Sequence, residues 1–321
     1  MGDELCASVV EAMGGTPLVE LGRFVRRRGL EGRILAKLEY VSPGGSKKDR
    51  IARQIIADAE AAGELVPGQC VVELTSGNTG TGLAIVCAVR GYPFVAVMSR
   101  GNSGERARMM QALGAEVVLV DQCAGSRPGR VSGEDLARVE AEARRIVAAR
   151  GAFRADQFHH RGNVRAHELH TGPELLRQSG GSITAFCDFV GTGGTLAGCA
   201  RALKAHDAGI ACYGVEPSSA AVLGGAVTRP GEHRIQGGGY AMRELAMLEG
   251  AVIDGYVSVK DEQAVATARA LAAEEGIFAG YSSGANVAAA VALLAGPCRG
   301  GTVAVVMCDT GLKYMSTGLW G

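Results

Sequence analysis

The chain has 321 residues, of which 47% are hydrophobic and 21% are charged, and its formal net charge at pH 7 is zero. This length and composition are typical of a globular protein with two domains. A neutral chain without a long apolar stretch has no general attraction to nucleic acid and no segment that spans a bilayer, so we expect a soluble protein that binds neither. Residues 1–12 also lack the basic and then apolar layout of a secretory signal.

Helical and strand patterns alternate along the first half of the chain. In chain order, the pattern predicts a helix over 49–62, a strand over 70–74, a helix over 80–90, a strand over 93–98, a helix over 105–113, a strand over 116–120 and a helix over 134–150. Residues 122–133 are rich in Gly, Ser and Arg, and we interpret them as a solvated loop, with an entrance lid over 124–133 as the alternative.

The second half repeats this alternation. It predicts strands over 185–190, 210–215 and 302–307, and helices over 195–206, 262–275 and 285–295. Alternation of this kind indicates an α/β fold with parallel sheets covered by helices.

Four glycine-rich turns each lie between an extended run and a helix. They are Pro43–Arg50, Thr75–Gly80, Gly191–Thr195 and Gly280–Asn286. Such turns point backbone N–H groups and the positive end of a helix toward an anion, and ligands of α/β proteins bind at such strand-to-helix turns.

One of these turns permits a second interpretation. Gly191–Gly198 follows a strand and opens a helix, as a dinucleotide-binding fingerprint does, and Glu216 follows the next strand at a distance suited to a ribose. A dinucleotide-dependent oxidoreductase is therefore the alternative outside the class favoured below. It is weakened because the motif begins mid-chain, and because it leaves Thr75–Gly80 and the adjacent lysines Lys47 and Lys48 unexplained.

At these residues the chain resembles the cysteine synthase and cystathionine β-synthase group of fold-type II pyridoxal 5′-phosphate (PLP) enzymes, and within it the compact O-acetylserine and O-phosphoserine sulfhydrylases. The resemblance covers nearly the whole chain. Besides the four turns, the segments that carry it are Gly14–Leu18, Gln157–Phe158, Thr171–Glu174, Ile235–Gly237, Glu275–Gly280 and Asp309–Gly318.

The resemblance implies a tryptophan synthase β-like fold of two domains with parallel-rich sheets flanked by helices. We expect a smaller mobile domain over residues 41–155, which holds the substrate carboxylate loop. Residues 1–40 and 156–321 form the larger domain that binds the PLP phosphate, and a homodimer is also implied.

The resemblance places the PLP-bound lysine at Lys48. Only six of the 33 basic residues are lysines, so each lysine asks for a specific explanation. A Schiff-base lysine must lose its proton to react, and a helix N-terminus lowers its pKa in that direction. The group commonly has an apolar residue where this chain has Lys47, which we interpret as solvated or facing the phosphate.

The other site residues follow from the same resemblance. The phosphate cup is Gly191, Thr192, Gly193, Gly194 and Thr195, and Asn78 faces the 3′-oxygen of PLP. The substrate α-carboxylate is bound by Thr75, Ser76, Thr79 and Gln157. For the loop at Thr75 the alternative role is a plain turn with a helix cap, since Ser, Thr and Asn favour such positions; Leu74 stands where the group usually has a proline.

The resemblance places Ser282 against the pyridine nitrogen, with a helix N-cap as the competing role for Ser282 or its neighbour Ser283. A hydroxyl leaves that nitrogen largely neutral, so a fully developed carbanion is stabilised less than it would be by a carboxylate partner. This favours loss of a β-leaving group directly after Cα is deprotonated.

The implied function is therefore β-replacement on an activated serine through an α-aminoacrylate intermediate, in which Lys48 also acts as general base. O-acetylserine is the favoured donor, because only Arg229 suggests a phosphate partner and a matching basic residue is common at Arg234. Open alternatives are a larger thiol or a nitrogen nucleophile as acceptor, and elimination of the serine/threonine dehydratase type.

Two further patterns bear on the class of protein. His159, His160, His167 and His170 lie close together, but the group has a histidine at His167 and we expect no metal site. Residues 159–161 depart from the group's pattern, which leaves the acceptor open.

The nine cysteines are scattered singly without a CxxC pair. An odd, dispersed set predicts reduced thiols in a cytoplasmic protein.

Overall fold

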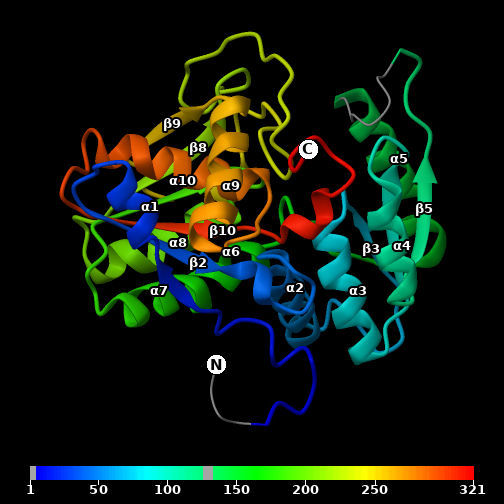
Figure 1. Cartoon of the computed structure of the whole chain (residues 1–321). Helices are drawn as coiled ribbons and strands as arrows, with labels where there is room; N and C mark the ends of the chain where they lie inside the picture. Colours follow the sequence, from blue (N-terminus) through cyan, green and yellow to red (C-terminus); the bar gives the residue numbers. More distant parts are fainter. Residues whose placement is uncertain (1–4, 126–132) are drawn as a thin grey trace. The chain divides into compact units, whose positions relative to one another are not determined.

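The computed structural model describes residues 5–125 and 133–321 (Figure 1). Its contacts divide the chain into two compact units. Unit 1 comprises Gly14–Lys47 and Val164–Gly321, and unit 2 comprises Lys48–Asn163 together with the N-terminal segment that ends at Met13. Lys47 and Lys48, which are neighbours in the sequence, are therefore assigned to different units.

Unit 1 contains a six-stranded sheet in the order β1-β2-β10-β7-β8-β9. Its strands are β1 (Leu18–Glu20), β2 (Arg33–Leu38), β7 (Ala185–Phe189), β8 (Ala211–Pro217), β9 (Gly255–Val259) and β10 (Thr302–Met307). Only the pairing of β1 with β2 is antiparallel, and the other pairs in this sheet are parallel. This architecture confirms the predicted parallel-rich α/β fold.

Helices cover both faces of this sheet, and this explains why strand β10 is apolar from Val303 to Met307. Val303, Val305 and Met307 belong to one core cluster, together with buried side chains of three helices. Ala304 and Val306 belong to a second cluster with side chains of two other helices. A strand buried on both faces has no polar alternation.

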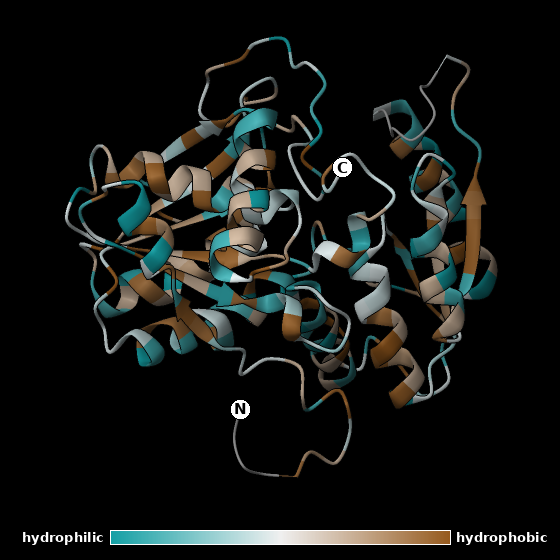
Figure 2. Cartoon of the chain, in the orientation of Figure 1, coloured by the Kyte–Doolittle hydropathy of each residue, from teal (hydrophilic) through white to brown (hydrophobic). Residues whose placement is uncertain are grey.

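The helices of the first cluster are α1 (Gly22–Arg27), α9 (Asp261–Glu275) and α10 (Tyr281–Leu294), and those of the second are α7 (Gly172–Ser179) and α8 (Gly194–His206). In Figure 2 hydrophobic residues form bands along α10, in keeping with its deep burial. A short helix α6 (Gly162–Ala166) and a π-helical segment η2 (His167–Thr171) precede α7.

Unit 2 contains a parallel four-stranded sheet in the order β5-β4-β3-β6. Its strands are β3 (Val71–Leu74), β4 (Phe94–Ser99), β5 (Glu116–Val120) and β6 (Phe153–Arg154), and its helices are α2 (Lys48–Ala62), α3 (Asn78–Arg90), α4 (Gly104–Ala112) and α5 (Gly133–Arg150). Buried residues of β3, β4 and α5 form its hydrophobic core.

The helices and strands predicted from the sequence are all found, within a few residues of their predicted bounds. The elements that the sequence did not predict are β1, α1, β2, β6, α6, η2, α7, β9 and the 3-10 helices η1 (Glu39–Val41), η3 (Ala246–Leu248) and η4 (Gly311–Tyr314). Helix α10 begins at Tyr281, four residues before its predicted start, which places Ser282 and Ser283 inside its first turn. Of the loop predicted over 122–133, residues 126–132 lie outside the described residues. No helix among the described residues is both long and apolar enough to cross a bilayer.

Candidate active site

The turn between β7 and α8 in unit 1 is built to receive an anion. Gly193 is the N-cap of α8 at φ +89° and has no side chain to cap the first turn, and the Thr192 hydroxyl accepts only a long hydrogen bond of 3.5 Å from the N–H of Gly194. A Cβ on Gly191 would lie only 2.6 Å from the carbonyl oxygen of Gly237, so a larger residue does not fit there. The uncapped positive end of a helix, approached through glycines, is a general phosphate-binding arrangement.

Thr192 and Thr195 of this turn are buried. Thr195 is hydrogen-bonded to His167, a histidine for which the sequence predicts no role in the site. The Thr195 hydroxyl lies 3.2 Å from Nε2 of His167, and the Nδ1 atom of His167 lies 2.9 Å from the Thr171 hydroxyl. His167 is fully buried. It therefore orients a hydroxyl of the cup, a role that the proximity of the histidines in sequence does not reveal.

Ser282 lies in the first turn of α10, in the same unit as the turn Gly191–Thr195. Gly280 is the N-cap of this helix, so neither Ser282 nor Ser283 takes the capping role that we had considered for them. Ser283 instead accepts a hydrogen bond of 2.9 Å from the backbone N–H of Cys308. Ser282 is 5% exposed.

The two adjacent lysines differ in their surroundings. Lys48 is the first residue of α2 and is half-buried. Lys47 is buried, and its Nζ lies 2.8 and 2.7 Å from the two carboxylate oxygens of Asp188. The prediction that Lys47 is solvated or faces the phosphate is therefore wrong, because its side chain is engaged by an acidic residue of β7.

The charge of Lys47 is maintained by this partner. Burial alone lowers the pKa of the ammonium group, but the negative charge of Asp188 more than offsets that effect, and the pKa of Lys47 is raised above its usual value. Lys47 is thus a cation throughout the physiological pH range, whereas a reactive amine must lose its proton.

In unit 2, the turn that precedes α3 is shaped by its own side chains. The Thr75 hydroxyl oxygen accepts hydrogen bonds of 3.0 Å from the N–H groups of Gly77 and Gly80. Gly77 has φ +141°, and a Cβ there would lie 2.5 Å from Cδ of Arg106. Ser76 is exposed, Asn78 is the first residue of α3, and Thr75 takes the turn-shaping role that we had weighed against substrate binding.

Arg106 is a residue of this loop region that sequence reasoning missed. It lies on α4, is 9% exposed, and donates a hydrogen bond of 2.9 Å to the carbonyl oxygen of Ser76. A buried guanidinium that holds a loop carbonyl fixes the loop and adds positive charge beside it. Its partner is 30 residues away in the sequence, so no local pattern indicates it.

Gln157 and Thr79 are brought together, as expected if both serve one carboxylate. The Thr79 hydroxyl donates a 2.7 Å hydrogen bond to Oε1 of Gln157. The amide nitrogen of Gln157 donates to the Leu74 carbonyl at 3.2 Å and to Oε1 of Glu73 at 3.3 Å. Burial raises the pKa of the Glu73 carboxyl to about 7, although Arg154 lowers it.

His159 and His160 have local partners. The Nδ1 atom of His159 lies 3.0 Å from both carboxylate oxygens of Asp156, and His160 accepts a 3.0 Å hydrogen bond from the N–H of Gly162. Among the residues that the structure describes, no group of three or more His, Cys, Asp or Glu side chains is placed to hold a metal ion.

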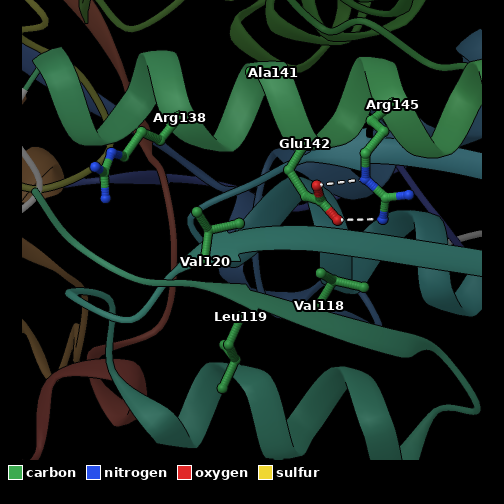
Figure 3. A pocket seen from close by; sticks show the side chains of 7 residues that line it. All are labelled: Val118, Leu119, Val120, Arg138, Ala141, Glu142 and Arg145. Atoms are coloured by element: carbon green, nitrogen blue, oxygen red, sulfur yellow. Dashed lines mark hydrogen bonds and ion pairs between the residues drawn. The ribbon is translucent and has the colours of Figure 1, made fainter.

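A surface pocket in unit 2 contains none of the predicted site residues (Figure 3). It has a volume of about 440 Å³ and lies between β5 and α5, with Leu119 and Arg138 in its lining. Its Arg145 is paired with Glu142 at 2.7 Å, so that charge is already neutralised. Because two of its three charged lining residues pair with each other and no predicted site residue lines it, we do not place the chemistry there.

Comparisons with known proteins identify the family to which the chain belongs. The family model described as "Pyridoxal-phosphate dependent enzyme" matches residues 9–309. The chain belongs to this family. It is 40% identical over 314 residues to a cysteine synthase of Staphylococcus aureus, covering 98% of this chain and 96% of that protein.

Two other relatives extend the comparison. An O-ureido-L-serine synthase of Streptomyces lavendulae is 38% identical, with coverage of 98% of this chain and 92% of the relative. The crystal structure of an O-acetyl serine sulfhydrylase, isoform 3, from Entamoeba histolytica aligns with a TM-score of 0.90 at 34% identity, covering 99% of this chain and 92% of that one. The fold-type II assignment and the resemblance to cysteine synthases are thereby confirmed, and PLP is the cofactor of this enzyme.

The residues present fit PLP as a cofactor. The glycine-capped start of α8, with buried Thr192 and Thr195 beside it, suits a phosphate dianion. Ser282, in the first turn of α10, offers a hydroxyl rather than a carboxylate to a ring nitrogen. Lys48 supplies an amine that is distinct from the permanently charged Lys47.

Proposed function

We propose that this PLP enzyme replaces the acetoxy group of O-acetyl-L-serine with sulfide and so forms cysteine. Similarity to cysteine synthases along nearly the whole chain supports β-replacement on an activated serine. The structural observation that carries the proposal is the presence, within unit 1, of a glycine-rich helix start suited to an anion and of a serine in the first turn of α10. A hydroxyl partner at Ser282 favours elimination and replacement over chemistry that needs a protonated ring.

Bound PLP supplies an electron-withdrawing group that makes the Cα proton of the amino acid acidic. We assign to Lys48 the attachment of the cofactor, the removal of the Cα proton as general base and the return of that proton at the end. The cup Gly191–Thr195 holds the cofactor phosphate, Asn78 binds its 3′-oxygen, and Ser282 faces its ring nitrogen.

Substrate binding falls to the turn before α3 and to Gln157. The loop offers the N-terminus of α3 and the Ser76 hydroxyl to a carboxylate, and Thr79 and Gln157 already share a 2.7 Å hydrogen bond. Thr75 contributes by holding the loop through two N–H groups. A carboxylate bound here orients the Cα–H bond for removal of its proton and helps to exclude water.

The choice of acetate over phosphate as leaving group is supported by the arginines of the 229–234 segment. Arg234 donates a 3.3 Å hydrogen bond to the Gly318 carbonyl, so its guanidinium has a partner within the protein. Arg229 lies exposed in a loop. A phosphate dianion calls for a bidentate arginine, whereas an acetyl ester needs none.

The sequence after Gln157 favours a second candidate for the nucleophile that adds to the substrate. The segment after Gln157 carries His159, paired with Asp156, and His160, which accepts a bond from the N–H of Gly162. The relative named O-ureido-L-serine synthase illustrates that similar chains serve products other than cysteine. A larger thiol or a nitrogen nucleophile is therefore the second candidate acceptor. We also propose a cytoplasmic location, in keeping with nine free cysteines. A homodimer is proposed on the resemblance to the sulfhydrylase group.

The test begins with borohydride reduction of the holoenzyme and peptide mapping. We expect the reduced PLP adduct on Lys48; an adduct on Lys47, or on neither lysine, contradicts the assignment. O-acetylserine and O-phosphoserine are then mixed separately with enzyme that lacks acceptor, and the visible absorbance of the cofactor is followed. Faster conversion by O-phosphoserine, abolished in Arg229→Ala, would reverse the choice of donor.

A further inference from the structure

Unit 1 contains a buried polar cluster whose members are Lys47, Asp188, Asn286 and Cys308. Lys47 bonds both oxygens of Asp188 at 2.8 and 2.7 Å. The side-chain amide of Asn286 donates to Oδ1 of Asp188 at 3.1 Å and to the Val306 carbonyl at 2.8 Å. The backbone N–H of Lys47 donates to the Cys308 carbonyl at 2.9 Å. All four residues are at least nine-tenths buried.

This cluster is not explained by stability. Removing two charges from water carries a large desolvation penalty, and buried ion pairs can often be replaced by apolar residues of similar volume without loss of stability. The cluster also leaves Oδ1 of Asn286 buried and without a hydrogen-bond partner among the described residues. A feature that brings no clear gain in stability calls for another reason, such as fixing one geometry among several.

The position of the cluster supplies that reason, since each member is adjacent to a segment assigned to the cofactor. Lys47 directly precedes Lys48, and Asp188 on β7 precedes the cup that begins at Gly191. Asn286 follows Ser282 by four residues on α10, and therefore lies on the same face of that helix.

Cys308 joins the cluster to the start of α10. Its N–H donates to Ser283, and its thiol interacts with both the Lys47 ammonium and the Ser282 hydroxyl. Burial raises the pKa of this thiol to about 11 even though the charge of Lys47 lowers it, so the thiol stays protonated and the cluster contains one cation and one anion.

We propose that Lys47 is a positioning residue of the β-replacement reaction. Its ion pair with Asp188 holds three segments in one fixed arrangement: the peptide that leads into Lys48, the strand that leads into the phosphate cup, and the first turn of α10 with Ser282. This inference rests on the proposed function, because it takes Lys48, the cup and Ser282 as the cofactor contacts. An apolar residue at position 47 can fill the space but cannot provide this directional link.

The test uses the double variant Lys47→Met/Asp188→Leu, which replaces the ion pair with apolar side chains and leaves no unpaired charge. We expect its urea midpoint to stay near that of the wild type. The visible circular dichroism of bound PLP, recorded without substrate, should change, and kcat should fall roughly 10- to 100-fold at a nearly constant KM. Lys47→Arg, which keeps the charge, should retain most of the circular dichroism signal and of kcat.

A matched control is the other buried lysine ion pair of unit 1, between Lys37 and Glu174 at 2.6 Å. Lys37→Met/Glu174→Leu makes the same chemical change away from the segments named above, and it should leave the circular dichroism of PLP unchanged. If both double variants alter the signal equally, or if the Lys47 double variant has wild-type kcat and circular dichroism, the proposal is overturned.

Should the double variant fail to fold, the same measurements are made on Asp188→Asn, because this change keeps the shape of the side chain and weakens the ion pair with Lys47. A changed circular dichroism signal and a lower kcat in this variant support the proposal, and wild-type values overturn it. Borohydride labelling is read separately, since failure to find PLP on Lys48 contradicts the proposed site whatever the variants of Lys47 show.

Discussion

At the scale of single residues, Glu73 is a buried carboxyl whose ionisation is coupled to the substrate side chains. Its Oε1 accepts from Gln157, and Gln157 in turn accepts from Thr79. Burial raises the pKa of Glu73 from 4.5 to about 7, with Arg154 opposing the shift. The amide of Gln157 therefore faces a carboxyl that changes its charge near neutral pH.

Glu73→Gln should remove a pH dependence of stability. Because the folded pKa is raised, the folded protein binds a proton between pH 4.5 and about 7 that the unfolded chain releases, so this group makes stability fall as pH rises through that window. We expect the variant to gain about 1–3 kcal/mol relative to the wild type on going from pH 5 to pH 8.

The measurement for this prediction is urea unfolding of both proteins at the two pH values. The control is Glu64→Gln, a change at an exposed glutamate of the same unit, which should leave the difference between the pH values as in the wild type. Equal pH dependence in Glu73→Gln and in the wild type would show that Glu73 keeps an ordinary pKa in the folded protein.

At the scale of elements, the start of α8 depends on close approach of two backbone segments. A Cβ on Gly191 would meet the Gly237 carbonyl oxygen at 2.6 Å, and neither partner is the flexible end of a side chain. Gly191→Ala should therefore shift the turn, weaken PLP binding at least tenfold and lower stability by about 1–3 kcal/mol.

Titration of the apoenzyme with PLP, followed by visible absorbance, measures this effect. Gly231→Ala is the matched control, because its added methyl would lie 3.5 Å from the nearest atom, the Cβ of Ser219, which is ordinary contact. PLP affinity equal to that of the wild type in Gly191→Ala would exclude this turn as the phosphate site.

At the scale of the whole molecule, the burial of the six lysines shows that they are not interchangeable surface charges. Lys37, Lys47 and Lys313 are all under 8% exposed. Lys37 bonds the Gln178 side chain at 2.7 Å and Lys313 donates to the Gly44 carbonyl at 2.8 Å. Lys204 is paired with Asp254. Three of the six lysines thus occupy specific buried positions, whereas Lys260 is exposed, so scarcity by itself does not assign a role to every lysine.

This distribution predicts the course of chemical labelling. When the native holoenzyme is treated with an amine-reactive ester, Lys260, which is exposed, should react first and Lys204 more slowly. Lys37, Lys47 and Lys313 should react only after unfolding. Peptide mass spectrometry over a time course measures this order, and early labelling of Lys47 would contradict both its burial and the positioning role proposed for it.

Much of the fold and part of the site were accessible from the sequence, for a local reason. Buried strands, amphipathic helices and glycine-rich turns are encoded within short stretches, and anion binding at a helix N-terminus uses backbone N–H groups that any such turn provides. The glycine-rich turn Gly191–Thr195 between a strand and a helix, and the position of Lys48 before a helix, could therefore be predicted from residues that are close together in the chain. The roles proposed for them come from the resemblance.

Only the tertiary structure decided which distant side chains meet. Lys47 and Asp188 are 141 residues apart, and His167 and Thr195 are 28 residues apart. Whether a lysine is solvated or buried beside an aspartate depends on which strands become neighbours. It also depends on whether the attraction of the opposite charge offsets the cost of desolvation, and a local sequence pattern predicts neither. For this reason Lys48 could be proposed as the cofactor lysine from the sequence and its resemblance, whereas the burial of Lys47 beside Asp188 is seen only in the folded chain.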